Sequence, residues 1–91
     1  MVRKSKLEKR VDILRILIHG PMKLTKLMRK TELNQNDLKQ HLSFLIQQNL
    51  VEEQNLGKDA IFYIITGRGL KVLNIVAPMI GEARKIQALL Y

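Results

Sequence analysis

The chain has 91 residues, of which 46% are hydrophobic and 4% aromatic, so it can form one small domain with a core of aliphatic side chains and Met. Its formal net charge of +8 favours polyanions, nucleic acid first and an anionic membrane surface second. It has no cysteine, which excludes disulfides, thiolate catalysis and cysteine-ligated zinc. We find no signal peptide, and the most apolar run, residues 75–80, is far shorter than the ~20 residues of a membrane span. We therefore expect a cytoplasmic protein.

The positive charge is concentrated in two segments. Residues 1–10 hold five cationic side chains against one acidic side chain, and residues 21–40 hold five against two. Residues 41–60 hold only one cation against three acids. The simplest alternative is a soluble basic surface without a partner, because net charge governs association and not fold. The uneven distribution instead favours a binding surface on the N-terminal arm and on residues 21–40.

A first helix is predicted to begin after Ser5. Ser5 and Glu8 have the spacing of a capping box, in which each side chain satisfies a free backbone N–H group. His19 and Gly20 suit a helix C-terminus, and Pro21 prevents continuation. The apolar stripe of this helix consists of Leu7, Val11, Leu14, Leu17 and Ile18.

A short second helix is predicted over Lys26–Thr31. Thr25 has the side chain of an N-cap, and residues 22–24 before it read as an extended link or a short strand. The inward-facing positions of this segment are Leu24, Leu27 and Met28.

A third, longer helix is predicted to follow Asn34 and to run to about Gln48. Asn34 is a good N-cap, and Asp37 suits the positive end of a helix. Residues 32–34 form the turn before it, and Asn49 is expected in the left-handed position that Gly usually occupies. The buried stripe consists of Leu38, Leu42, Leu45 and Ile46.

A hairpin and a last helix complete the predicted fold. Residues 50–54 and 60–65 read as strands joined by a turn at 56–59, because the second segment is rich in β-branched and aromatic side chains. Thr66 is the predicted cap of the last helix, which Pro78 should kink or break in two.

The last helix carries a heptad-like apolar seam. Its apolar arc is wider than one small domain can cover, so its second face packs on a partner subunit or its far part folds back on its own core. We favour a homodimer. The predicted dimerisation residues are Val72, Val76, Met79, Ala83, Ile86 and Leu90.

The polar face of the third helix is rich in carboxamides and has no carboxylate beyond Asp37, whereas most exposed helix faces mix Lys and Glu. Following a short helix and a tight turn, such a helix can enter the DNA major groove. Gln and Asn then pair with adenine, and Lys reaches guanine. This face also carries Gln47, and the alternative is that it is an ordinary solvated helix face. The predicted base-reading residues are Gln35, Asn36, Lys39, Gln40 and Ser43.

Basic side chains around this helix suit contacts with DNA phosphates, which orient a protein without reading sequence. Any one of them could instead be a free surface charge. The predicted backbone and wing contacts are Arg3, Lys4, Lys6, Lys26, Arg29, Lys30 and, at the hairpin tip, Lys58.

No enzymatic site, metal site or cofactor is predicted. His19 and His41 lie on different predicted helices without a cluster of further ligands, and His41 is expected to fill a polar edge of the third helix or to meet a phosphate. Residues 67–69 contain two glycines but lack the third Gly and the strand–helix–strand context of a nucleotide-binding loop.

This order of elements resembles the winged helix-turn-helix DNA-binding family, in particular small basic archaeal proteins with a C-terminal dimerising helix. The resemblance covers about residues 5–80 and implies a mainly α fold, with three helices plus a β-hairpin wing, that binds double-stranded DNA as a dimer. Residues 1–67 would then be the DNA-binding domain with its basic arm, and residues 68–91 the dimerisation helix. Departures from the family pattern are Asn49, Pro78 and Gly81. The residues that carry the resemblance are 24–28, 33–34, 38–42, 45, 50–51 and 63–69.

Three functions stay open. The amide-rich face favours a dimeric transcription regulator that reads a short palindromic site, and the basic arm also suits a nucleoid-associated, chromatin-type binder of little sequence preference. The apolar last helix suits a protein–protein interaction module, since winged helices also serve as scaffolds. The sequence identifies no small-molecule effector.

Overall fold

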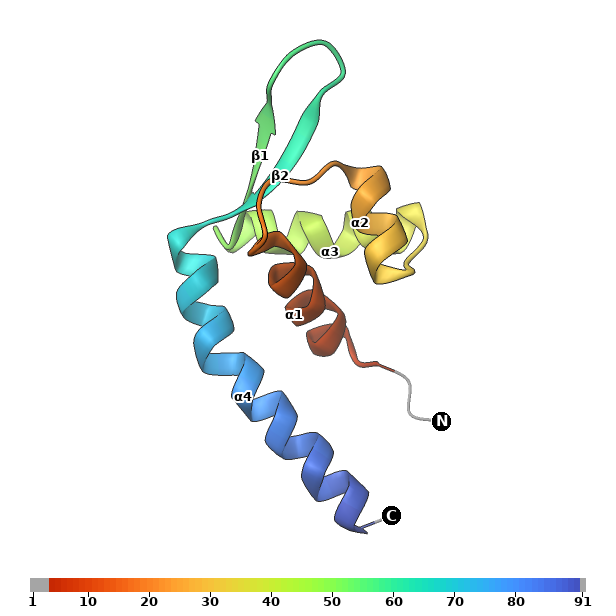
Figure 1. Cartoon of the computed structure of the whole chain (residues 1–91), viewed down its shortest axis with the longest axis vertical. Coiled ribbons are helices and arrows are strands. Elements are labelled where there is room, and N and C mark those ends of the chain that lie inside the picture. Colours follow the sequence, from red (N-terminus) through yellow and green to blue (C-terminus); the bar gives the residue numbers. More distant parts are fainter. Residues whose placement is uncertain (1–3, 91) are drawn as a thin grey trace.

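The computed structural model describes residues 4–90, apart from the side chains of Arg84 and Gln87 (Figure 1). Its elements are α1 (Lys6–Leu17), α2 (Leu24–Thr31), α3 (Gln35–Gln47), β1 (Val51–Asn55), β2 (Ile61–Ile65) and α4 (Gly67–Leu90). This is the predicted mainly α architecture of three helices, a β-hairpin and a long C-terminal helix. Within these residues, no helix combines the length and apolar character needed to cross a membrane.

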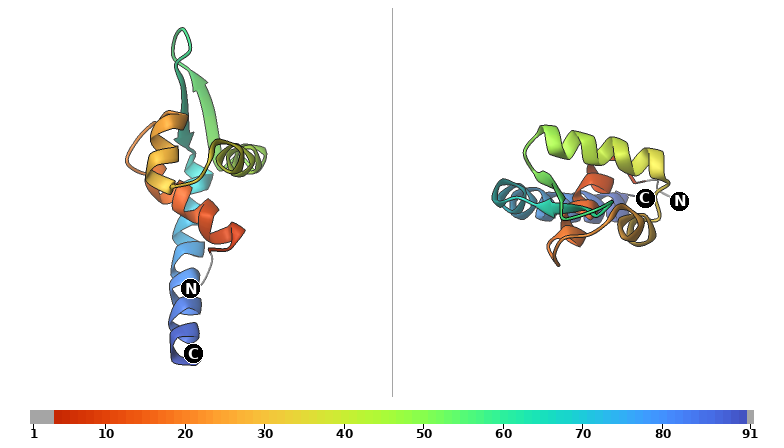
Figure 2. Two further views of the ribbon diagram at one scale, coloured as in Figure 1. Left: turned by 90° about the vertical axis from the view of Figure 1, so that its right-hand side faces the viewer. Right: turned by 90° about the horizontal axis from the view of Figure 1, so that it is seen from above.

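The hairpin and α4 extend in opposite directions from a bundle of the first three helices, which gives the molecule a long axis of 51 Å (Figure 1). Seen along this axis, α3 and α2 flank the base of the hairpin (Figure 2). Contacts of α3 with β1 and of α2 with β2 hold them there. The hairpin therefore forms one end of the molecule and the far part of α4 the other, with α3 at the base of the hairpin (Figure 1).

The core surrounds α1, which contacts α2, α3, β2 and α4. Because α1 is covered from several sides, Ile13 is fully buried although it lies off the predicted stripe. Leu7 and Ile18, at the two ends of that stripe, are instead 53% and 49% exposed. The buried core consists of Val11, Ile13, Leu14, Leu17, Met22, Leu27, Leu38, Leu42, Leu45, Leu50, Val51, Leu73 and Ile80.

Side-chain caps begin α1 and α3 as predicted. The Ser5 hydroxyl accepts a hydrogen bond from the Glu8 backbone N–H at 3.1 Å. Asn34 Oδ1 accepts one from the Asp37 N–H at 2.8 Å. Asn49 has a φ of 59°, which confirms the left-handed position after α3.

The predicted start of α2 is wrong. The helix begins at Leu24, Lys23 is its N-cap without a side-chain hydrogen bond, and Thr25 already lies inside the first turn. The cause is a contact that is distant in sequence: Met22 and Tyr63 exchange two backbone hydrogen bonds, of 3.1 and 2.9 Å. This isolated bridge fixes the chain at Met22 and leads it directly into the helix.

The hairpin is antiparallel, with Val51 opposite Ile65 and Asn55 opposite Ile61, so its strands agree with the prediction to within one residue. At the exposed tip, Gly57 has a φ of 143°, a conformation that L side chains rarely adopt.

The cap of α4 is the predicted one. The Thr66 hydroxyl accepts a hydrogen bond from the Gly69 N–H at 2.9 Å and donates one to the Asn49 carbonyl at 2.6 Å. The helix then runs without interruption through Pro78, so the alternative of two separate helices is not found. Leu73 in its first half and Ile80 just past its midpoint belong to the core.

Candidate nucleic-acid interface

One side of α3 exposes polar residues while the other is held in the core. Leu38, Leu42 and Leu45 are at most 2% exposed, which fixes the rotation of the helix about its axis. The residues predicted to read bases all lie on the solvent-exposed side of the helix, and these are Gln35, Asn36, Lys39, Gln40 and Ser43.

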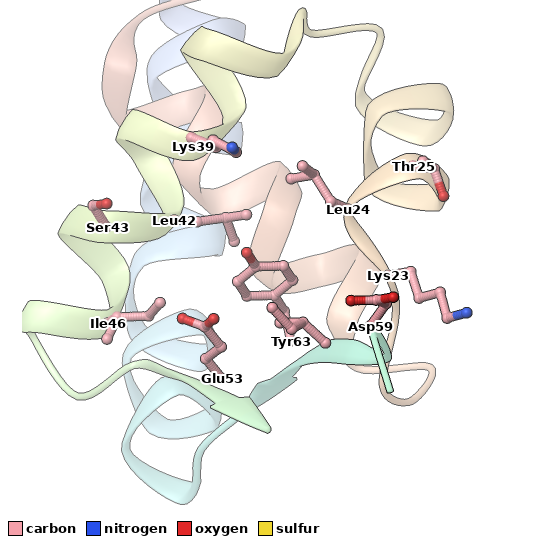
Figure 3. A pocket seen from close by; sticks show the side chains of 11 residues that line it. Lys23, Leu24, Thr25, Lys39, Leu42, Ser43, Ile46, Glu53, Asp59 and Tyr63 are labelled. Atoms are coloured by element: carbon pink, nitrogen blue, oxygen red, sulfur yellow. The ribbon is translucent and has the colours of Figure 1, made fainter. Parts of the chain in front are cut away.

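A cavity of about 480 Å³, which we call the basin, lies between α3, the start of α2 and the hairpin. Lys39 and Ser43 line it from α3, and Lys23 and Thr25 line it from the start of α2, with the Lys23 ammonium directed away from α3 and the Tyr63 ring between the two helices (Figure 3). The basin thus joins two of the predicted base-reading residues to two residues that sequence analysis did not single out as contacts. Because the predicted helix began at Lys26, the sequence carried no local signal for Lys23.

The charge of the basin is balanced. Lys23 and Lys39 line it together with Glu53 and Asp59. Tyr63 lies opposite Glu53 in the hairpin register, and burial, followed by the charge of Glu53, raises the pKa of the Tyr63 phenol. The phenol therefore keeps its proton at neutral pH and can donate a hydrogen bond from the floor of the basin. Phosphate contacts must come largely from cations outside it.

Cations are available on α2 and on the hairpin. Lys26 and Arg29 are exposed on α2, and Lys58 is exposed at the hairpin tip. These three side chains, together with Lys23 and Lys39, belong to the elements that border the basin.

The other residues predicted to contact the DNA backbone lie away from the basin or outside the described residues. Lys4 and Lys30 line a separate cavity of about 280 Å³ between α1 and α2, where Lys4 Nζ is 2.7 Å from an Asp12 carboxylate oxygen. Lys6 lines a third cavity, between α1, α3 and α4. Arg3 lies outside the described residues. The structure therefore does not place the whole basic set on one surface.

Comparison with protein families gives a match to the winged helix-turn-helix family over residues 3–84. The chain belongs to this family. In this family the second helix of the helix-turn-helix is called the recognition helix, and α3 occupies that position. The β1–β2 hairpin occupies the position of the wing. Among curated proteins, no significant match was found.

Several solved structures share this winged-helix fold. AbsC, a MarR family transcriptional regulator from Streptomyces coelicolor, matches with a TM-score of 0.72 and 23% identity over 84% of this chain and 55% of its own. The reduced form of the Bacillus subtilis transcriptional regulator YodB matches with a TM-score of 0.68 and 23% identity over 78% and 72%. BpsR from Bordetella bronchiseptica, whose DNA binding is regulated by 6-hydroxynicotinic acid, matches with a TM-score of 0.76 and 14% identity over 85% and 56%. The chain thus spans little more than half the length of AbsC and BpsR. The narrower likeness to archaeal proteins remains a prediction.

The winged-helix recognition helix is anchored to α1 by a cluster that sequence analysis did not identify. Arg10 donates a hydrogen bond from Nε to His41 Nδ1 at 3.3 Å, and its guanidinium lies 3.7 Å from the centroid of the Phe44 ring. His41 is only 7% exposed, in line with the expected polar edge of the helix. Burial first, and the charge of Arg10 next, lower the pKa of the His41 imidazole. The cluster therefore requires a neutral histidine.

Proposed function

We propose that this protein is a homodimeric transcription regulator that binds double-stranded DNA, with α3 in the major groove and the wing on the adjacent backbone or minor groove. Its winged-helix family, its net charge of +8 and the regulators that share its fold support the proposal. The observation that carries it is the exposed, carboxamide-rich side of α3, which borders the basin beside the wing.

The chemistry of that side suits direct readout of base edges. Gln35, Asn36 and Gln40 can each donate and accept hydrogen bonds in the bidentate pattern that adenine offers, and Lys39 can reach the acceptors of guanine. All four lie in the N-terminal two turns of α3, the part of a recognition helix that contacts bases. Ser43, one turn further on, would contact either base type.

Phosphate contacts would come first from Lys26 and Arg29 on α2 and from Lys58 on the wing, next to the base-reading side. The proposal keeps Arg3, Lys4, Lys6 and Lys30 as outer contacts. Lys4 would then exchange its ion pair with Asp12 for a phosphate. Such contacts set the register of the complex and add a steep salt dependence.

The dimer would form through α4. Val72 and Val76 are half-buried against the core of their own subunit, so the free part of the predicted seam begins at Met79. From there Met79, Ile86 and Leu90 are 64%, 55% and 74% exposed. A second α4 that covers these residues and Ala83 would pair two recognition helices for a palindromic site.

The test is a binding-site selection with the full chain at several salt concentrations. We expect a recovered DNA motif and a loss of affinity of about 0.9 log units per phosphate contact for each log unit of salt. Gln40→Ala should relax one base position and lower the ratio of specific to random affinity by about 5- to 100-fold. Gln47→Ala, which removes the same side chain from the last turn of the same helix, is the matched control and should keep the motif.

Other outcomes would contradict the proposal. If the selected pool shows no preference while the steep salt slope persists, the protein is a chromatin-type binder. If no DNA is retained at low salt, the winged helix serves another partner.

A further inference from the structure

An apolar cavity of about 490 Å³ lies on the far side of α3 from the basin, between α1, the C-terminal half of α3 and the first half of α4. Its floor is formed by core residues, among them Val11, Leu14 and Leu73. Among the residues that the structure describes, the charged side chains that line it are Lys6, Arg10 and Arg68, and no acidic side chain does. An apolar site with cations alone is complementary to a ligand that has an apolar body and an anionic head.

Both arginines of this cavity are held in place through Nε. Arg10 Nε donates to His41 Nδ1 and its guanidinium stacks on Phe44, while Arg68 Nε donates to the Gln48 carbonyl at 3.1 Å. Phe44 and Gln48 are four residues apart, at the C-terminal end of α3, so the two guanidiniums stand over successive turns of one helix face. Among the described residues, no hydrogen bond to the terminal nitrogens of either arginine is found. These donors are therefore preorganised for a carboxylate.

The cavity continues away from the arginines along α1 and α4. A second cavity of about 290 Å³ shares Leu7 and Val76 with the first and is completed by Met79, Ile80 and Ala83. None of the described residues that line it is charged. We call the two cavities together the α1–α4 trough. A compact ring would occupy only the first cavity, whereas an extended hydrocarbon chain can follow the whole trough and gain affinity from each buried methylene group.

We propose that the α1–α4 trough binds a long-chain aliphatic carboxylate, with the carboxylate between Arg10 and Arg68 and the chain directed toward Ala83. Met79 and Ala83 also belong to the proposed dimer contact, so a second α4 would cover the Ala83 end of the trough rather than the cavity that holds Arg10 and Arg68. The only acidic residue of α4, Glu82, lies 4.0 Å from Lys85 of the same helix. A copy would leave the three cations of the cavity without an anion. The assignment goes beyond DNA binding and does not depend on it.

The test is calorimetric titration of the full chain, without DNA, with dodecanoate below its micelle concentration. Dodecyl maltoside carries the same chain on an uncharged head, and benzoate carries a carboxylate on a compact ring. We expect saturable binding of one dodecanoate per chain, at least about tenfold tighter than either comparison compound. Dodecyl maltoside lacks the hydrogen bonds of a charged head, each worth about that factor or more, and benzoate lacks the buried methylene groups of the chain.

Two variants locate the head group. Arg68→Gln and Arg10→Gln should each weaken dodecanoate binding about tenfold or more. Arg29→Gln, which removes the same charge from exposed α2, should not change it. Thermal melts establish that each variant is folded. Arg10 also anchors α3, so Arg10→Gln could fail to fold. In that case the result for Arg68→Gln alone tests the position of the head group.

Several results would overturn the assignment. Absence of dodecanoate binding would do so, and this includes the case in which a second subunit covers the trough and prevents binding. Equal affinity for dodecyl maltoside would show that the head group is not recognised, and equal affinity for benzoate would show that the long chain is not. An equal loss of dodecanoate affinity in Arg29→Gln would show that the net charge of the protein, and not the two arginines of the cavity, sets the affinity. Since no DNA is present, none of these results depends on whether the protein regulates transcription.

Discussion

Arg10 Nε lies 3.3 Å from Nδ1 of His41 and joins α1 to α3 across 31 residues of sequence. An arginine Nε–H can only donate, so Nδ1 must be the accepting nitrogen and the imidazole proton must be on Nε2. A second proton on the ring would remove the acceptor and place a positive charge beside the guanidinium. The attachment of the recognition helix to α1 therefore depends on the charge state of one histidine.

This contact predicts a loss of stability in mild acid. Burial and the nearby cations Arg10, Lys9 and Lys6 lower the pKa of His41 in the folded state, against a smaller opposite effect of Asp37. The unfolded chain, with an imidazole pKa near 6.5, then takes up the proton more readily than the folded chain. The contribution of His41 is complete above pH 6.5 and decreases as the pH falls below it. Urea unfolding at pH 7.5, 6.5 and 5.5 measures this decrease.

The matched variant is His41→Asn, whose Oδ1 atom offers an acceptor near the position of Nδ1 but does not titrate in this range. The difference in pH dependence between the two proteins isolates the imidazole from the carboxylates. Identical pH profiles of the free energy of unfolding would mean that His41 is not the group responsible.

A second prediction concerns Gly69 in the first turn of α4. A Cβ at this position would clash with the Leu50 carbonyl oxygen and lie 2.7 Å from Ile65 Cγ1. The Leu50 carbonyl cannot retreat freely, because it accepts a hydrogen bond from the Thr66 N–H at 3.0 Å. We expect Gly69→Ala to cost about 1–3 kcal/mol of unfolding free energy in urea denaturation, the usual cost of overpacking.

Gly67→Ala is the control for this change. It lies two residues earlier, where a Cβ would point into open space in the described structure. The control should be neutral or slightly stabilising. A loss of similar size in both variants would indicate that helix propensity, and not the approach of Leu50, sets the requirement for glycine.

The third prediction contrasts two threonines that both looked like helix caps. Thr66 makes two hydrogen bonds, to the Asn49 carbonyl and from the Gly69 N–H. Thr25 lies inside α2 with its side chain on the exposed surface. We expect Thr66→Ala to lower the free energy of unfolding by about 1–2 kcal/mol and Thr25→Ala to change it by less than about 0.5 kcal/mol. A comparable loss of unfolding free energy for Thr25→Ala in urea denaturation would indicate that Thr25 does cap α2.

The two threonines also show how far the sequence determines the fold. Caps that depend only on residues three or four apart, such as Ser5 and Asn34, were predicted at the right position. The start of α2 was not, because the bridge between Met22 and Tyr63 joins segments far apart in the chain. The burial of Ile13 was missed for the same reason, since helical periodicity describes one face and α1 is covered on several.

The candidate interface was likewise predictable only where it depends on residues close in sequence. Helical spacing was sufficient to place Gln35 and Gln40 on an exposed side of α3, because the leucines opposite them fix the helix in the core. The basin was not predictable, since Lys23, Glu53 and Tyr63 come from three elements that meet only in the folded chain. Whether these groups contact DNA stays a prediction.

The last prediction concerns the dimer that the proposed function requires. Ile86 is 55% exposed on the predicted seam of α4, and a charge there would be costly inside an apolar helix–helix contact. We expect wild type to sediment as a dimer at micromolar concentration and Ile86→Glu to shift toward the monomer. Asn74→Glu places the same charge on an exposed position of α4 away from the seam and should leave the dimer intact. A monomeric wild type, or equal dissociation of both variants, would remove the seam as the dimer contact.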